Sequence, residues 1–380
     1  MKHRICSCFI FLLVFLISHF ALAFPAKLGP VVDQIYNADF SQARTNVNAY
    51  IHDNPEEPAG YLLRGILNEW DQVVNNKRGG NNRIIQEDYE KANMLAEAAL
   101  ASDENNVDKM VMLGNTDMYI AKKLVDSGNK MRGGFALRKA KDLMLQAIAL
   151  DPNNYDAYMA LGVFNYFSEN VPSGFKWLAS LLGFNGNKTT GLNYLKHAAE
   201  NKNLTQGDAG FLVVYIYERK EKDYDTALKY NAILKARYPN NPTFQYDDGE
   251  LYFHKKDYDG SRRAYAQFEN FCASKAASFC NNKYLFLMHY YKTWGYLDQE
   301  KYADAKKEYD LAVKLNDGQY AERNAQLDLW GLQFAKKKGD TELANVFLKK
   351  IAENKKSNPA AWRQAQIELG IDPDKEKHRD

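Results

Sequence analysis

The stretch LLGFNGNKTTGLNYL, residues 181–195, contains residue types that a phosphate-binding loop uses to hold a nucleotide. These residues are Gly183, Gly186, Lys188 and Thr189. Such a loop needs Gly-Lys-Ser/Thr without interruption, after a strand and before a helix. Here Asn187 separates the glycine from the lysine, and the preceding FKWLASLL has a helical pattern. The sequence therefore predicts a connection between two helices rather than a nucleotide site.

Other catalytic and metal-binding signatures are missing from the sequence. There is no His-Glu-x-x-His and no Gly-x-Ser-x-Gly. Beyond residue 23 the histidines are scattered without metal-ligand spacing, at His52, His197, His254, His289 and His378. KDYDTA at 222 and KDYDG at 256 resemble the start of a calcium loop, but they lack its third alternating ligand. We therefore expect no enzymatic activity, no metal and no cofactor, and we interpret both stretches as turns between helices.

Residues 1–23 have the three parts of a secretory signal peptide. Lys2 and Arg4 precede an apolar run from Phe9 to Ile17, and Ala21-Leu22-Ala23 offers small residues for cleavage. The run is shorter than the roughly 20 residues of a membrane span, although an uncleaved N-terminal anchor is the alternative. We expect cleavage after Ala23, a secreted or periplasmic protein, and no membrane span after cleavage.

The charge of the chain argues against a nucleic-acid partner. The full sequence has 50 basic and 48 acidic side chains, and residues 1–23 remove two basic ones, which leaves 48 of each. A protein that relies on phosphate contacts usually has a basic excess. We therefore expect no nucleic acid among the partners.

A pattern of small and bulky residues recurs along the chain. The stretch AIALDPNNYDAYMALGVFNYF, residues 147–167, shows the pattern. It has an alanine followed at fixed offsets by Asp-Pro, a tyrosine and Leu-Gly. Comparable positions recur at Ala43, Pro55, Tyr61 and Gly65; at Ala99, Met110 and Gly114; and at Ala227, Pro239 and Gly249. Small residues let paired helices approach closely, and proline ends a helix. The pattern resembles the tetratricopeptide repeat, a unit of two antiparallel helices about 34 residues long.

This resemblance implies an all-α fold, an α-solenoid of antiparallel helix pairs with about seven to eight repeats over residues 24–373. A charged tail, residues 374–380, follows. The family usually binds proteins, so it implies a non-enzymatic scaffold for another protein or peptide. The alternatives are an accessory subunit of an envelope assembly or transport complex, and a small-molecule binder that uses the concave groove.

Three consecutive units are longer than the others. Gly249 and Ser261 are 12 residues apart, whereas the corresponding separations from Gly65, Gly114 and Gly162 are 27, 26 and 29. We expect inserts between paired helices near 70–90, 120–138 and 168–190, rich in Gly and Asn and gathered at one edge. They predict a basic docking edge made of Lys77, Arg78, Lys130, Arg132 and Lys188. The alternative is lengthened hairpins with solvated tips.

Aromatic residues recur at offsets that point into the concave face of the family. They are Trp70, Tyr119, Tyr166, Phe167, Tyr246, Phe253, Tyr290 and Trp294. Large aromatic side chains contribute strongly to binding interfaces, so they predict an aromatic ligand groove. The alternative is that they fill the core between the long helices.

Only Cys272 and Cys280 remain after removal of the signal peptide. An exported protein with two cysteines is a candidate for one disulfide. Eight residues of helix span about 12 Å, and bridged Cα atoms lie roughly 4.4–6.8 Å apart, so the bridge requires the chain to turn between them. Two buried free thiols on a continuous helix are the alternative.

Overall fold

The computed structural model describes residues 25–77, 82–169, 183, 185–275, 280–356 and 358–372. All regular secondary structure in these ranges is helical. The predicted signal peptide, Arg78 and the 374–380 tail lie outside them. The α-helices are α1 (Gly29–Tyr36), α2 (Phe40–Asp53), α3 (Pro58–Asn75), α4 (Asn82–Ala101), α5 (Val107–Asp126), α6 (Lys130–Leu150), α7 (Tyr158–Glu169), α9 (Lys188–Glu200), α10 (Gln206–Ile216), α11 (Tyr224–Arg237), α12 (Pro242–His254), α13 (Tyr258–Ala273), α14 (Asn282–Asp298), α15 (Tyr302–Leu315), α16 (Ala321–Lys338), α17 (Thr341–Ala352) and α18 (Pro359–Glu368).

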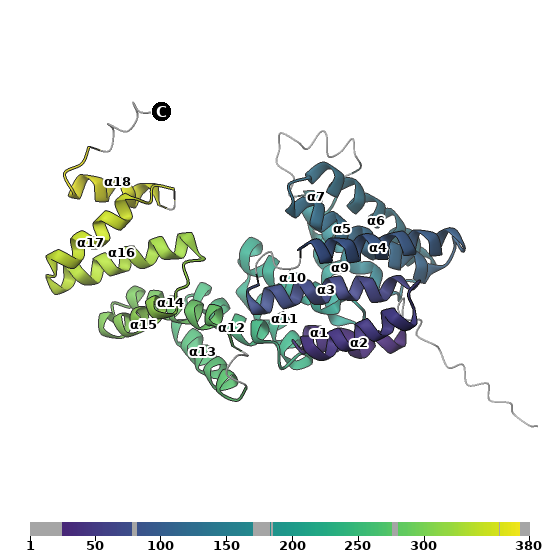
Figure 1. Cartoon of the computed structure of the whole chain (residues 1–380), viewed down its shortest axis with the longest axis horizontal. Helices are drawn as coiled ribbons and strands as arrows, with labels where there is room; N and C mark the ends of the chain where they lie inside the picture. Colours follow the sequence, from purple (N-terminus) through teal and green to yellow (C-terminus); the bar gives the residue numbers. More distant parts are fainter. Residues whose placement is uncertain are drawn as a thin grey trace, which may run out of the picture.

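Consecutive helices pack as pairs, and the pairs stack into a superhelix (Figure 1). The pairs run from α1/α2 through α3/α4, α5/α6, α7/α9, α10/α11, α12/α13 and α14/α15 to α16/α17, and α18 packs on α17. The predicted all-α solenoid of about seven to eight repeats is confirmed.

Glycine on the first helix of a pair marks the point of closest approach to the second. A Cβ atom at Gly249 would lie 2.1 Å from Cε1 of Tyr265, and one at Gly65 would lie 2.2 Å from Cε1 of Tyr89. Both tyrosines are fully buried. The glycines of the repeat pattern therefore leave room for a large side chain of the partner helix.

Replacing Gly249 with alanine is expected to lower the free energy of unfolding by about 1–3 kcal/mol, because overpacking forces Tyr265 to move. Chemical denaturation followed by circular dichroism measures the change. Gly29→Ala is the matched control, since nothing lies within 4 Å of its added Cβ atom. Equal stabilities of the two variants would contradict a role for Gly249 in close packing.

The first two predicted inserts are mostly helical, which corrects their interpretation as loops. Helices α3, α4, α5 and α6 have 18, 20, 20 and 21 residues, against 13 and 16 for α12 and α13. The added turns carry apolar side chains that are buried, such as Val74 and Ile85. Burial of these side chains stabilises the helical conformation in segments where the Gly and Asn content had suggested a loop. In the third long unit, residues 170–182 and 184 lie outside the described ranges.

The two stretches resembling calcium loops are turns between helices, as expected. Lys222 and Lys256 have left-handed backbone, with φ of 58° and 64°. Each following aspartate accepts a hydrogen bond at the start of the next helix. Asp223 accepts from the backbone N–H of Thr226 and Asp257 from that of Gly260. Such caps satisfy N–H groups that a helix leaves unpaired.

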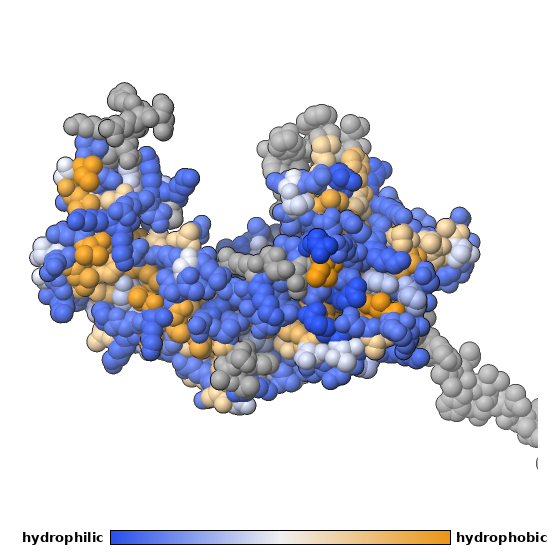
Figure 2. All heavy atoms as spheres, viewed as in Figure 1, coloured by the Kyte–Doolittle hydropathy of each residue, from blue (hydrophilic) through white to orange (hydrophobic). Residues whose placement is uncertain are grey.

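The molecule consists of a body and an arm, with a hollow between them on the face shown in Figure 2. One hydrophobic core extends from Leu28 to Leu251 and builds the body. A second core, between Tyr246 and Trp330, begins the arm, and a small third one lies around Leu348. In the body the chain returns to its start: the side-chain amide of Asn241 donates to the carbonyl of Tyr36 over 2.8 Å.

A disulfide joins Cys272 and Cys280, with Cα atoms 5.6 Å apart. Helix α13 ends at Ala273, before the second cysteine, so the chain leaves the helix between them. This is the pairing that the sequence predicted. Within the described residues, no helix combines the length and apolar character that a membrane crossing requires.

Candidate ligand-binding site

An apolar cavity of about 550 Å³ lies inside the body. Helices α5, α6, α7 and α10 form its walls, and α3 contributes one residue. The lining residues are Glu69, Met118, Tyr119, Ala121, Lys122, Val125, Asp126, Lys130, Gly133, Gly134, Leu137, Met159, Val163, Phe167, Asp208, Phe211, Leu212 and Tyr215. Its volume falls in the range of about 300–1,000 Å³ that is typical of small-molecule sites.

Asp208 lines the cavity from the first turn of α10. Its carboxylate accepts a 2.7 Å hydrogen bond from Nε1 of Trp70 and another from the hydroxyl of Tyr119. Burial raises the pKa of Asp208, although the hydrogen bonds from these donors and from Tyr36 oppose that rise. Three helices that are distant in sequence are thereby joined at one side chain.

The mouth of the cavity is marked by its exposed residues, which include Val125, Phe167 and Tyr215. Next to it, Nζ of Lys122 lies 3.0 Å from a carboxylate oxygen of Glu69 and 3.4 Å from one of Asp126. Burial raises the pKa of Glu69, and the charge of Lys122 opposes that rise. The wall is therefore largely apolar, with paired charges along one side.

The predicted aromatic groove is wrong for six of its eight residues, which are buried in the core. These are Trp70, Tyr119, Tyr166, Tyr246, Phe253 and Tyr290. Some of these rings are covered by later helices, and others by the partner helix of their own pair. Trp70, for instance, packs edge-on against Phe211 and Phe244, at centroid distances of 5.4 and 5.6 Å. Phe167 and Trp294 are each 39% exposed. Of the eight predicted residues, the cavity brings together only Tyr119 and Phe167.

Two of the four described cations of the predicted basic edge are already paired with acids. Nζ of Lys77 lies 3.0 Å from Asp71, and that of Lys188 lies 2.5 Å from Glu221. Lys130 lies on the cavity and Arg132 is exposed two residues later. These pairings reduce the positive charge that a docking edge would offer to a partner, because a cation that is already paired with an acid attracts a second anion more weakly than an unpaired cation does.

The glycines of the stretch that resembles a phosphate loop serve packing. A Cβ atom at Gly186 would lie 2.3 Å from the backbone oxygen of Asn165 on α7, and one at Gly191 would lie 2.5 Å from the backbone nitrogen of Tyr166. Asn187 caps α9, since its side chain accepts from the backbone N–H of Thr190. The described part of the stretch leads into and begins α9, the partner helix of α7.

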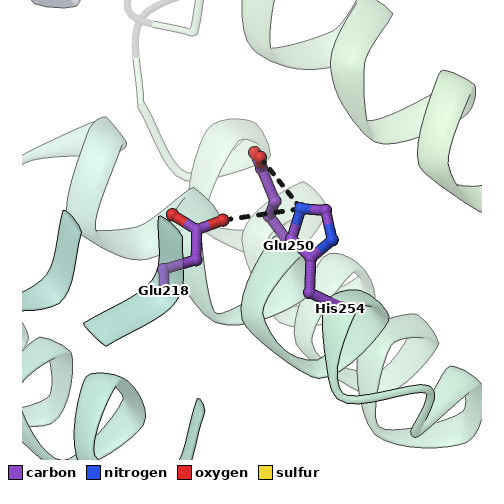
Figure 3. Close-up of side chains that lie close together, drawn as sticks. All are labelled: Glu218, Glu250 and His254. Carbon is purple, nitrogen blue, oxygen red and sulfur yellow. Dashed lines mark ion pairs between the residues drawn. The ribbon is translucent and has the colours of Figure 1, made fainter. Parts of the chain in front are cut away.

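A second polar cluster lies where the body meets the arm and gathers Glu218, Glu250 and His254 (Figure 3). Nε2 of His254 is 3.5 Å from a carboxylate oxygen of each glutamate. Glu218 belongs to a turn of π-helix, Tyr217–Glu221, that extends α10. The sequence search missed this cluster. The spacing of Glu250 and His254, four residues apart on one face of α12, is the signal that could have found it.

Arg219 supplies positive charge to this cluster. Its guanidinium contacts Glu250 and lies 3.1 Å from Glu218. Burial and repulsion by Glu250 raise the pKa of Glu218 to about 7. Burial alone would raise the pKa of Glu250 too, but its interactions with His254 and with the charge of Arg219 prevail and hold the pKa at about 2. A metal ion at the three potential ligands would have to displace the guanidinium, so the cluster is best described as a buried charge network.

Comparison with known proteins agrees with the repeat architecture. Residues 157–320 match the family model "Iml2/Tetratricopeptide repeat protein 39". No curated protein sequence matches the chain. Among solved structures, yeast Tom70 aligns with a TM-score of 0.46 and 15% identity, over 83% of this chain and 57% of that one.

Two further structures align over most of their own length. The C-terminal part of a TPR repeat-containing protein from Cytophaga hutchinsonii has a TM-score of 0.38 and 15% identity, over 78% of this chain and 97% of that one. The human IFIT1 dimer with m7Gppp-AAAA has a TM-score of 0.42 and 13% identity, over 94% and 89%. The stacked helix pairs with glycine at their contacts, and the family-model match over residues 157–320, agree with a tetratricopeptide-repeat architecture.

Proposed function

We propose that this chain is a non-enzymatic binding scaffold of the cell envelope, exported by residues 1–23 and periplasmic, and that its cavity holds the apolar part of a ligand. The observation that carries the proposal is the cavity of about 550 Å³ inside the body, with apolar walls from four helices. An enclosed apolar space with a few fixed polar groups is the usual form of a binding site. The balanced charge after residue 23 supports a ligand other than nucleic acid.

Two kinds of ligand fit this proposal. A protein or peptide partner could insert a large apolar side chain as an anchor, as tetratricopeptide-repeat proteins usually bind proteins. Such a partner would make the chain an accessory subunit of an envelope assembly or transport complex. A small amphipathic molecule is the second candidate, and the volume and the burial of the inner wall favour it.

Replacing Val163 with tryptophan is expected to abolish ligand capture, because the indole would fill the cavity that Val163 lines. Tagged mature protein is recovered from the envelope fraction, and native mass spectrometry identifies what remains bound. Val346→Trp makes the same change at a 46% exposed position on α17 and should leave capture intact. A ligand held equally by wild type and by the Val163 variant would place binding outside the cavity. The mass of the released ligand separates a protein from a small molecule.

A further inference from the structure

The walls of the cavity suit a flexible alkyl chain. Met118, Met159, Leu137 and Leu212 come from four different helices and line the cavity with flexible apolar side chains. The two methionines are buried, and their unbranched side chains adapt to irregular shapes. Gly133 lets α6 approach α5 closely, because a Cβ atom there would lie 2.7 Å from Cγ2 of Val125 and 2.9 Å from the backbone oxygen of Ala121.

The inner end of the cavity disfavours an anionic group. Asp208 is partly buried there, and the hydrogen-bond donors around it already serve its carboxylate. A further negative charge beside Asp208 would be repelled by that carboxylate, so we expect a ligand with an anionic group to direct its apolar end toward Asp208.

At the mouth of the cavity, one lysine has no acid of the described residues within ion-pair distance. Lys130 lines it, and no acid among the described residues pairs with that lysine, whereas the other lining lysine, Lys122, contacts both Glu69 and Asp126. Lys130 is also the first residue of α6, a helix of 21 residues whose N-cap, Asn129, makes no side-chain capping hydrogen bond. The N-terminus of a helix carries partial positive charge, which adds to that of the lysine.

From these observations we propose that the cavity binds a single-chain anionic amphiphile, with the alkyl tail between α5, α6, α7 and α10 and the anionic head beside Lys130 and the first turn of α6. This inference rests on the proposed function, since it names the ligand of the same cavity. A free long-chain carboxylate and a lysophospholipid phosphate share this chemistry. The head group lies in solvent at the mouth, where both would be accommodated.

The test measures binding of probes with the same alkyl chain and different heads to mature protein from which bound lipid has been removed. The probes are an alkyl carboxylate, a lysophosphatidate, an alkyl alcohol and an alkyl trimethylammonium, each used below its critical micelle concentration in isothermal titration calorimetry. Both anions are expected to bind more tightly than the alcohol, and the cation least tightly. The anion that binds more tightly shows whether the ligand is a free long-chain carboxylate or a lysophospholipid. Each additional methylene should tighten binding about fourfold until the cavity is full.

Lys130→Gln should weaken binding of the anionic probes about fivefold, as for one exposed ion pair, and leave the alcohol unchanged. Lys301→Gln is the matched control, because Lys301 is an exposed lysine at the start of α15. Equal affinity of alcohol and carboxylate, or an unchanged preference in the Lys130 variant, would overturn the assignment of the head group and leave the proposed function standing. If no probe binds, the amphiphile is wrong. If, in addition, Val163→Trp leaves the captured ligand in place, the cavity itself is wrong.

Discussion

Replacing Asp208 with alanine should lower the free energy of unfolding by about 2–4 kcal/mol. The change leaves the indole N–H of Trp70 and the hydroxyl of Tyr119 without their acceptor, in a part of the body where both side chains are buried. An unsatisfied buried donor costs roughly 1–3 kcal/mol. The variant also no longer bears the cost of taking a carboxylate out of water, and this gain offsets part of the loss from the two unsatisfied donors.

Thermal and urea unfolding of wild type and variant measure this loss. A double-mutant cycle with Trp70→Phe, which keeps an aromatic ring but removes the N–H, isolates the Trp70–Asp208 bond. We expect the two changes together to cost less than the sum of the single ones. Strictly additive losses would mean that the two side chains do not interact. Because Asp208 lines the cavity, loss of the network should also loosen the inner wall and weaken ligand binding.

The stability of the body should fall as pH rises from about 4 to about 7, and Asp156 should be a main cause. This aspartate is 3% exposed, and burial raises its pKa to about 7 despite the hydrogen bond that it accepts from the backbone N–H of Leu204 over 2.6 Å. In the unfolded chain an aspartate titrates at about 4. The folded protein therefore binds this proton more tightly, and the resulting stability is complete below pH about 4 and is lost as pH rises through about 7.

Replacing Asp156 with asparagine should flatten this dependence. A shift of this size corresponds to about 4 kcal/mol at most, so we expect the decline between pH 4 and 7 to shrink by about 2–4 kcal/mol in urea titrations at several pH values. A smaller decline should remain, because Glu218 titrates in the same window. Asp53→Asn, at a side chain that is 75% exposed, should keep the wild-type profile. An unchanged decline in the Asp156 variant would show that another group causes it.

The repeat architecture was predictable from the sequence because its determinants are local. A glycine such as Gly249 is followed 12 residues later by a small residue on the partner helix, and this spacing describes one helical hairpin. Asp223 and Asp257 begin helices by capping N–H groups three residues ahead. Cys272 and Cys280 are close enough in sequence that leaving one helix brings them together. Each of these features needs only neighbouring residues and backbone geometry.

The candidate site depended on tertiary structure because it joins repeats that are distant in sequence. Trp70 and Asp208 are 138 residues apart, and no periodicity within a repeat indicates that the superhelix curves enough to bring them together. The same curvature buried Trp70, which the pattern had placed on an open face. Packing between consecutive pairs brought Glu218 beside His254. Helical periodicity identifies the apolar side of each helix, but the packing angles between repeats decide whether another helix, a cavity or solvent covers that side.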